Sequence, residues 1–294
     1  MAVKLGSSSV SKLYLGSTEV TKAYLGSAEI YANVNNNLVF TVQSDVVGTS
    51  NDNQFTIPTL GSGYLYDIST DDGYTATGVT GNHTITFPSG VGVHTVTISA
   101  ELGGFPTFYF NNGGDRLKIL YISNFGIYGY GSTSQQFAFR GCFLLTVSAT
   151  DIGYFENVNN FRFMFENTSV STLPLIDTSA VTNFESTFKN CNFITFPALN
   201  FSSSTKFQNT WSGCTNLVNF PPNMFDNSLA TNYTNAFNNT NLSQTSIDNI
   251  LVSIDISATI NGTFKQSGGS APSSTGLAAI NSLVAKGWSV IYTN

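Results

Sequence analysis

Residues able to do acid–base chemistry are few in this chain and widely spread. Its 294 residues include 17 Asp and Glu and two His, without the patterns of a phosphate loop, a dinucleotide loop, a zinc-protease helix or a serine nucleophile. Two carboxylates hydrolyse a glycoside only when the fold holds them at a defined separation. Neither Glu156 with Glu166 nor Asp226 with Asp248 has a spacing that predicts this. We predict a protein that is not an enzyme, without catalytic residues or a cofactor; a polysaccharide depolymerase is the enzymatic alternative.

Patterns for metal binding are equally weak. Asp67, Asp71 and Asp72 precede Gly73, but an EF-hand needs oxygen ligands at alternate positions before its glycine. An Asp-Gly pair between two β-forming segments is typical of a hairpin turn. Both histidines lie among β-forming residues, which indicates strand positions rather than ligands. We predict no metal site.

The three cysteines, Cys142, Cys191 and Cys214, occupy one position of a repeat, and no CxxC pattern occurs. Thr168 and Thr240 take the same position in the other copies. Exchange of Cys with Thr predicts a small buried side chain. A disulfide between Cys191 and Cys214 of neighbouring copies is the alternative.

Aromatic residues define this repeat. Five large rings recur at steps of 26, 23, 23 and 26 residues, namely Phe139, Phe165, Phe188, Trp211 and Phe237. In the last four copies another ring stands four residues earlier, at Phe161, Phe184, Phe207 and Tyr233. An i, i+4 aromatic pair predicts one short amphipathic helix per copy. A fixed period in this range predicts stacked copies whose five anchor rings form a ladder in one core.

Proline and hydroxyl residues mark element ends within the copies. Leu173-Pro174, Phe196-Pro197 and Phe220-Pro221 each close an extended segment. Because proline cannot donate to a strand ladder, these strands should be short. The stretches 177–179 and 202–204, Asp-Thr-Ser and Ser-Ser-Ser, predict helix N-caps.

Two stretches carry a resemblance to a known family. Phe188-Lys-Asn-Cys191 and Trp211-Ser-Gly-Cys214-Thr-Asn-Leu217, with Asp177-Thr-Ser-Ala-Val-Thr-Asn-Phe184 between copies, resemble the BspA-like leucine-rich-repeat surface proteins. The resemblance covers residues 131–243 and implies a short solenoid used for adhesion. Aromatic residues here stand where that family has leucine, and the copies are few.

The first 33 residues hold a shorter repeat. Leu-Gly-Ser recurs every ten residues, at Leu5, Leu15 and Leu25. Each unit predicts a strand, as over residues 10–15, and then a Gly-Ser-Thr-Glu turn. So small a meander needs other surfaces to pack on, so we expect residues 1–33 to attach or oligomerise the protein. Tandem Tyr-Leu-Gly-Ser units resemble those of bacteriophage virion proteins of the tail and tail fibre.

Residues 34–130 read as a β-sandwich. Seven short β-forming runs separated by Gly-rich turns predict an immunoglobulin-like arrangement, with strands at 38–42, 54–58, 64–68, 83–87, 94–98, 107–110 and 117–122. The run at 64–68, the Asp-Asp-Gly turn and the run at 94–98 resemble the PKD-like module. That module's Trp-Gly-Asp turn is replaced here by Ser69-Thr-Asp-Asp-Gly73.

Residues 244–294 predict a cap over the last repeat. A helix is expected from Thr245 to Ser253, and a second over residues 277–286 with Ile280, Leu283 and Val284 inward. Gly287 suits the position after a helix end, and a final strand is expected over 288–292. The predicted fold is therefore multidomain and mainly β with an α/β part: repeats (1–33), sandwich (34–130), solenoid (131–243) and cap (244–294).

Exposed side chains on the strand-bearing face are the expected contact residues of a solenoid. An aromatic shelf at the junction before the repeats is a second place for a sugar, with core packing as its alternative. The candidate binding residues are Ser171, Thr172, Thr195, Asn219, Tyr128 and Tyr130.

Composition narrows the function. Charged residues are 10% of the chain against about 25% in typical proteins, and the net charge is −6. Without a basic cluster, nucleic-acid binding is not expected, and no apolar run is long enough to insert into a membrane. No signal peptide is visible at Met1. We predict a non-enzymatic phage virion protein, a tail-fibre or tail-associated adhesin, assembled in the host cytoplasm and exposed on the particle.

Its expected partners are other virion proteins, through the N-terminal repeats, and a glycan or protein of the host surface. A homo-oligomer is expected, with a trimer as the usual state of a fibre. The alternatives are a bacterial cell-surface adhesin of BspA-like type and a phage capsid decoration protein.

Overall fold

The computed structural model describes residues 36–102, 104–257 and 259–293, together with six short strands within residues 4–32. The chain divides into two compact units, residues 1–36 and residues 37–294. The described part is mainly β, with several sheets and two helices. The predicted mainly-β class with an α/β part at the C-terminal end is consistent with this.

The described residues of the first unit form three antiparallel strand pairs of one design. Their strands are β1 (Lys4–Leu5) with β2 (Ser8–Ser9), β3 (Tyr14–Leu15) with β4 (Thr18–Glu19), and β5 (Lys22–Leu25) with β6 (Ala28–Ala32). Each leucine of the ten-residue repeat pairs with the residue three positions later, as Leu15 does with Thr18. Thr18 and Glu19 therefore belong to a strand and not to the turn we predicted. Residues 10–13 of the expected strand lie outside the described residues.

The second unit begins with a six-stranded sheet of order β10-β9-β12-β7-β13-β14. Its members are β7 (Leu38–Gln43), β9 (Leu65–Thr70), β10 (Thr75–Val79), β12 (Val93–Leu102), β13 (Ile119–Asn124) and β14 (Thr146–Val147). A separate pair joins β8 (Gln54–Ile57) to β11 (His83–Thr86). Alternate residues such as Leu38, Phe40 and Val42 are fully buried, so one face of β7 packs into the core.

The sheet differs from its prediction in two strands. Residues 107–110 do not form a strand; Phe108 makes one isolated bridge to Thr59, and Phe110 N–H donates to Ala138 of the first repeat. Conversely, β10 has only exposed and half-buried residues, so no apolar alternation marked it. The parallel pairing of β13 with β14 carries the sheet past residue 130 into the repeats, and the two parts are continuous.

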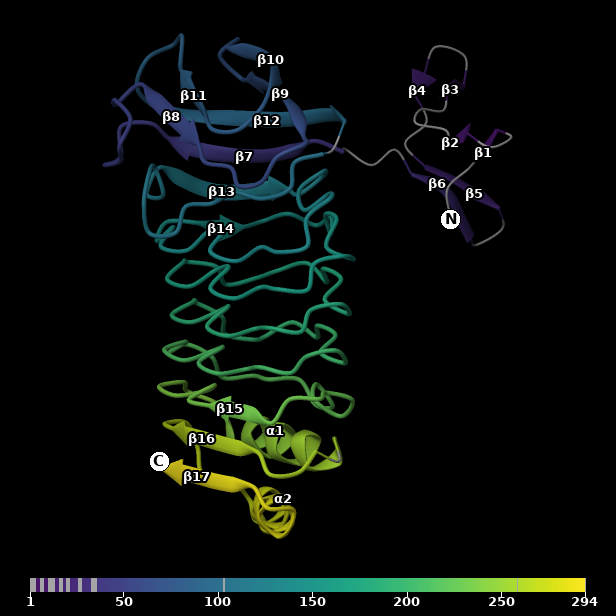
Figure 1. Cartoon of the computed structure of the whole chain (residues 1–294), viewed down its shortest axis with the longest axis vertical. Helices are drawn as coiled ribbons and strands as arrows, with labels where there is room; N and C mark the ends of the chain where they lie inside the picture. The colour runs from purple at the N-terminus through teal and green to yellow at the C-terminus, as the bar shows by residue number, and fades with distance from the viewer. Residues whose placement is uncertain are drawn as a thin grey trace. The chain divides into compact units, whose positions relative to one another are not determined.

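The repeats form a stack of coils without helices, so the predicted short helix per copy is wrong (Figure 1). Every coil has two left-handed residues four positions apart, at Phe137 and Gly141, Phe163 and Asn167, Ser186 and Asn190, Asn209 and Gly213, and Asn235 and Asn239. A right-handed helix excludes such residues. Consecutive turns replace it, and they also bring two aromatic residues four apart onto the buried side.

The predicted N-caps are likewise turns. Asp177 Oδ1 accepts from the N–H of Ser179 at 2.9 Å, and Asn200 Oδ1 accepts from Ser202 at 2.9 Å. No helix follows either position. These side chains therefore stabilise Asx-type turns that reverse the chain within a coil.

Main-chain hydrogen bonds join neighbouring coils at every second residue. The N–H groups of Phe161, Phe163, Phe165 and Asn167 donate to carbonyls of the next coil at 2.9–3.0 Å. The same four positions of the next two coils donate in the same direction. Intervening N–H groups close turns inside a coil, as when Met164 donates to Phe161. Nearly all main-chain donors at the turns are thereby used.

The predicted ladder of anchor rings is confirmed. The ring centroids of Phe139 and Phe165 lie 5.4 Å apart, and the next steps to Phe188 and Trp211 measure 6.1 and 6.3 Å. Trp211 and Phe237 stack at 4.8 Å with planes 2° apart. All five rings are fully buried. They form one continuous aromatic core along the stack.

The C-terminal part adds β15 (Asn232–Thr234), α1 (Gln244–Ile256), β16 (Thr263–Ser267), α2 (Ser274–Ala285) and β17 (Ser289–Thr293). The three strands form a parallel sheet in the order β15-β16-β17. Both predicted helices are present, and Gly287 follows α2 with φ +81°. Leu283 is buried as expected, whereas Val284 is 54% exposed because it lies on the outer side of the last helix.

Truncation of an anchor ring should destabilise the stack strongly. We expect Phe188→Ala to lower the free energy of unfolding by about 3–5 kcal/mol, because it removes a buried ring from the ladder. Ile194→Ala, at a side chain 62% exposed in the same coil, is the matched control and should change it by less than about 0.5 kcal/mol. Denaturant unfolding followed by circular dichroism measures both. Equal effects would contradict a shared aromatic core.

The left-handed positions give a second test. Asn209 has φ +56° and its N–H donates to Thr234 of the next coil. Asn209→Gly should be tolerated, whereas Asn209→Val should cost about 1–2 kcal/mol because a branched Cβ disfavours this backbone conformation. Thermal unfolding compares the two variants, and a Val variant as stable as the Gly variant would exclude the turn geometry.

Candidate functional site

Four of the six predicted binding residues lie together on one exposed surface, which we call the strand face (Thr146, Ser171, Thr172, Thr195 and Asn219). Thr195 and Asn219 form a parallel bridge, and Asn219 Nδ2 donates to Thr195 Oγ1 at 3.2 Å. Thr172 Oγ1 donates to the carbonyl of Val147 in the preceding coil at 2.9 Å. The short strands predicted before Pro174, Pro197 and Pro221 are not formed, and β14 is the one strand of this face. An isolated bridge and side-chain hydrogen bonds between coils align these hydroxyl and amide groups into a row instead.

The two tyrosines at the junction do not join this surface. Tyr128 is fully buried, and its hydroxyl donates to Gln135 Oε1 at 2.6 Å. The prediction of Tyr128 as a binding residue is therefore wrong, and its ring packs in the core, which was the alternative interpretation. Tyr130 is 48% exposed and meets Tyr154 edge to face at 5.3 Å, apart from the strand face. One ring without a second exposed partner makes a poor shelf for a sugar.

A longer polar row was missed from the sequence. We call it the threonine row, and it consists of Thr133, Asn159, Thr182, Thr205 and Thr231, all exposed. The N–H of Asn159 donates to Thr133, that of Thr182 to Asn159 and that of Thr205 to Thr182, each at 2.9 Å. The sequence does show this row as a repeated spacing. Thr133 stands two residues before Gln135, and the other four members each stand two residues before a repeat ring, at Phe161, Phe184, Phe207 and Tyr233.

The hydroxyl groups of this row are held in place. Thr182 Oγ1 donates to the carbonyl of Asn159, and Thr205 Oγ1 to that of Thr182, both at 3.0 Å. Their acceptor lone pairs are thereby left toward solvent in a fixed orientation. Adjacent strands lie about 4.8 Å apart, so the row offers polar groups at a regular interval.

Asparagines beside the threonine row support its backbone. Oδ1 of Asn160, Asn183 and Asn232 each accepts from the N–H two residues later at 3.0 Å. The remaining members of that position are Ser134 and Lys206, which also belong to the parallel bridges. These amides hold the entry into the turns, so they stabilise the row rather than bind.

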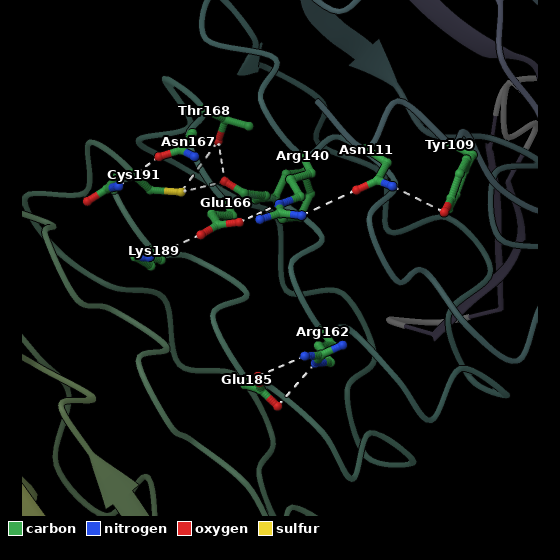
Figure 2. A network of polar contacts seen from close by, with 12 residues as sticks. Tyr109, Asn111, Arg140, Arg162, Glu166, Asn167, Thr168, Glu185, Lys189 and Cys191 are labelled. Carbon is green, nitrogen blue, oxygen red and sulfur yellow. Dashed lines mark hydrogen bonds and ion pairs between the residues drawn. The ribbon is translucent and has the colours of Figure 1, made fainter. Parts of the chain in front are cut away.

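Charged side chains gather beyond these rows in a network (Figure 2). Glu166 is buried and accepts from Arg140 Nε at 2.5 Å, while Lys189 Nζ lies 3.2 Å from its other oxygen. Arg162 pairs with Glu185 at 3.1 Å. Each carboxylate therefore has a cation from a neighbouring coil, which links coils through side chains as well as the main chain.

The guanidinium groups of this network also lie against rings. Phe137 and Phe163 stack at 5.2 Å, and the Cζ atoms of Arg140 and Arg162 lie 4.6 and 4.4 Å from the Phe163 centroid. Rings covered in this way cannot stack on a ligand, and the arginines already have carboxylate partners. The network is structural and does not form a phosphate site.

The three cysteines and the buried Lys118 are also enclosed in the structure. All three cysteines are free and buried, and burial raises the pKa of Cys191 to about 12. The Cys191–Cys214 disulfide is therefore not formed, and these thiols are poor nucleophiles. Lys118 is fully buried, with Nζ donating to carbonyls of Asn51 and Gln54 at 2.8 and 2.9 Å.

Beside Lys118, Asp115 accepts main-chain hydrogen bonds from Ser50, Thr56 and Thr49. Burial alone would raise the pKa of Asp115, but these bonds hold it below its ordinary value. The pair therefore holds the chain before β8 in place.

The carboxylates considered for glycoside hydrolysis have structural partners. Asp226 accepts from Ser253 Oγ of α1, and Asp248 accepts from Ser273 at the start of α2. A hollow of about 240 Å³ between two coils, lined in part by Leu199, Phe201 and Met224, is smaller than most ligand pockets. A second hollow, of about 520 Å³ beside α2, is lined by apolar side chains such as Leu277 and Ile280, with Tyr292 as its one polar side chain. The exposed rows of the stack are the best candidate site for polar contacts, and contact there would be with a surface.

Comparison with protein-family models, with curated proteins and with solved structures finds no match. Neither helix of the described chain has the length and apolar character needed to cross a bilayer.

The buried carboxylate of the network, Glu166, should matter more for stability than the partly buried Glu185. We expect Glu166→Gln to lower the free energy of unfolding by about 1–3 kcal/mol, because Arg140 and Lys189 lose their shared anion. Glu185→Gln is the control and should cost less than about 1 kcal/mol, since its pair with Arg162 is more exposed. Denaturant titrations at low and high salt compare them; a smaller loss for Glu166→Gln would contradict this assignment.

Proposed function

We propose that the protein is a non-enzymatic structural component of a bacteriophage virion, a tail-fibre or tail-associated adhesin. Its coil stack, a solenoid of the BspA-like leucine-rich-repeat type, presents the threonine row and the strand face to a glycan or protein of the host surface. The N-terminal strand pairs attach or oligomerise the protein, and an immunoglobulin- or PKD-like sheet region serves as a spacer.

One observation carries this proposal: exposed hydroxyl and amide groups recur on successive coils along two rows. Such rows can form many weak hydrogen bonds with an extended, hydroxyl-rich partner, while a fixed backbone keeps the entropic cost of binding low. Five of the ten charged residues between positions 131 and 243 pair within the network. Charged residues are also only 10% of the whole chain, so nonspecific attraction to charged partners is weak.

A bacterial cell-surface adhesin and a capsid decoration protein share these surfaces and differ in location. Gold-labelled antibody against this chain, applied to purified phage particles in electron microscopy, separates the three. Label at the tail supports the proposal; label on the capsid favours the decoration protein, and unlabelled particles exclude a virion role. Tail-less particles give the matched control.

The binding surface is tested with two charge-introducing variants. Thr182→Glu with Thr205→Glu alters the threonine row, and Thr172→Glu with Thr195→Glu alters the strand face. We expect one pair to weaken adsorption of the labelled chain to host cells by about tenfold or more, because a buried charge replaces a hydrogen bond at the contact. Each pair is the control for the other, and full adsorption by both would refute binding through these rows.

A further inference from the structure

Two turns of the sheet region meet beside one buried histidine. His94, near the start of β12, has a side chain only 4% exposed, and its ring stacks on Phe87 at 3.8 Å with planes 2° apart. The tip of the β9–β10 hairpin places Asp71 and Asp72 beside it, with side chains 49% and 9% exposed. His94 stands 22 positions after Asp72 and 23 after Asp71, which is why motif spacing did not connect them.

Hydrogen bonding sets the orientation of the histidine. Its Nε2 lies 3.1 Å from the carbonyl of Gly90, which can only accept, so Nε2 carries the proton. In the neutral ring, Nδ1 then has no proton and carries a lone pair. That lone pair faces Asp72 Oδ2 at 3.6 Å and Asp71 Oδ1 at 4.0 Å. A buried lone pair opposite two carboxylates is repulsive unless a positive charge lies among the three atoms.

The carboxylate of Asp72 is itself oriented. Its Oδ1 accepts from Thr70 Oγ1 at 2.5 Å, and its Oδ2 accepts from the N–H and the hydroxyl of Ser89 at 3.1 and 2.9 Å. A backbone carbonyl on the far nitrogen of a histidine, with hydrogen-bonded carboxylates beside it, is the usual outer shell of a metal site. Asp71, half exposed, leaves a path for entry.

We propose that His94 Nδ1, Asp72 and Asp71 bind one divalent cation of the zinc class, with water completing the coordination. The three donor atoms lie within 4.8 Å of one another. Two ligands at zinc bond lengths of about 2.1 Å lie about 3.4 Å apart around a tetrahedral ion. The Nδ1–oxygen separations of 3.6 and 4.0 Å are near this value.

A protonated His94 is the rival explanation, since an imidazolium also places charge among these atoms. It would draw a carboxylate oxygen to about 2.7–2.9 Å, and both contacts are longer than that. One imidazole nitrogen with two carboxylate oxygens is a donor set for zinc and similar ions rather than for magnesium. Bound there, the ion would tie the hairpin tip to the start of β12.

The test uses the full chain without a polyhistidine tag, stripped of metal by a chelator. Titration of Zn²⁺ in a calorimeter should give one site per chain, and Zn²⁺ should raise the melting temperature. Asp71→Asn, at a half-exposed position that preserves the fold, should weaken Zn²⁺ affinity by at least about tenfold. Asp67→Asn is the matched control on the same hairpin, because Asp67 accepts from the N–H of Gly78 outside the cluster.

Histidine resonances give an independent readout. The chain has two histidines, and His83, whose Nε2 lies 2.7 Å from the Tyr74 hydroxyl, serves as the internal reference. Long-range proton–nitrogen spectra should show Zn²⁺ shifting Nδ1 of His94 and leaving His83 unchanged. Three results would overturn the proposal. The titration could show no one-to-one Zn²⁺ site, the Asp71→Asn protein could bind Zn²⁺ with unchanged affinity, or the metal-free protein could have both nitrogens of His94 protonated at neutral pH.

Discussion

The hydrogen-bond ladder between coils is the constraint on which the rest of the second unit depends. Alternate N–H groups of one coil donate to carbonyls of the next, so each coil must keep its peptide groups parallel to the stack. Two left-handed residues per coil allow this, and asparagine or glycine fills most of these positions at low cost. The ladder also fixes the distance between coils, which places the ring of Phe139 on Phe165 and Trp211 on Phe237. The aromatic core is therefore a consequence of main-chain spacing as much as of hydrophobic burial.

That ladder decides what the surface can present. Residues two positions before the inner rings point outward on every coil, and their main chain is already bonded, so Thr182 and Thr205 have little freedom. Charged residues are drawn into pairs such as Arg140 with Glu166 that link coils. The members of the threonine row and the strand face are exposed, neutral and polar, which suits repeated hydrogen bonds with an extended partner. The proposed adhesive role rests on these rows of oriented hydroxyl and amide groups.

The sheet and the stack are one body because they share strands and main-chain bonds. β14 pairs with β13 although it belongs to the first repeat, and Phe110 donates to Ala138. The sheet thereby covers the N-terminal end of the aromatic core, where an open coil would leave rings and donors exposed. At the C-terminal end, β15, β16 and β17 continue the same direction of stacking with helices in place of turns. The proposed cation lies in the sheet region and would stabilise that region alone.

The sequence alone determined the buried rings of the repeat and how often they recur. The anchor rings, the interchange of Cys191 with Thr168, both C-terminal helices and most strands were readable, because burial imposes a period on the chain. It did not determine the backbone conformation of the repeats. Either one helix or two turns with left-handed residues would bring Phe161 and Phe165 to the same side, and the structure has the turns. Nor did the sequence bring Asp72 to His94, place Tyr128 in the core, or expose Val284. Those outcomes depend on which distant segments pack together, and only the tertiary structure decides that.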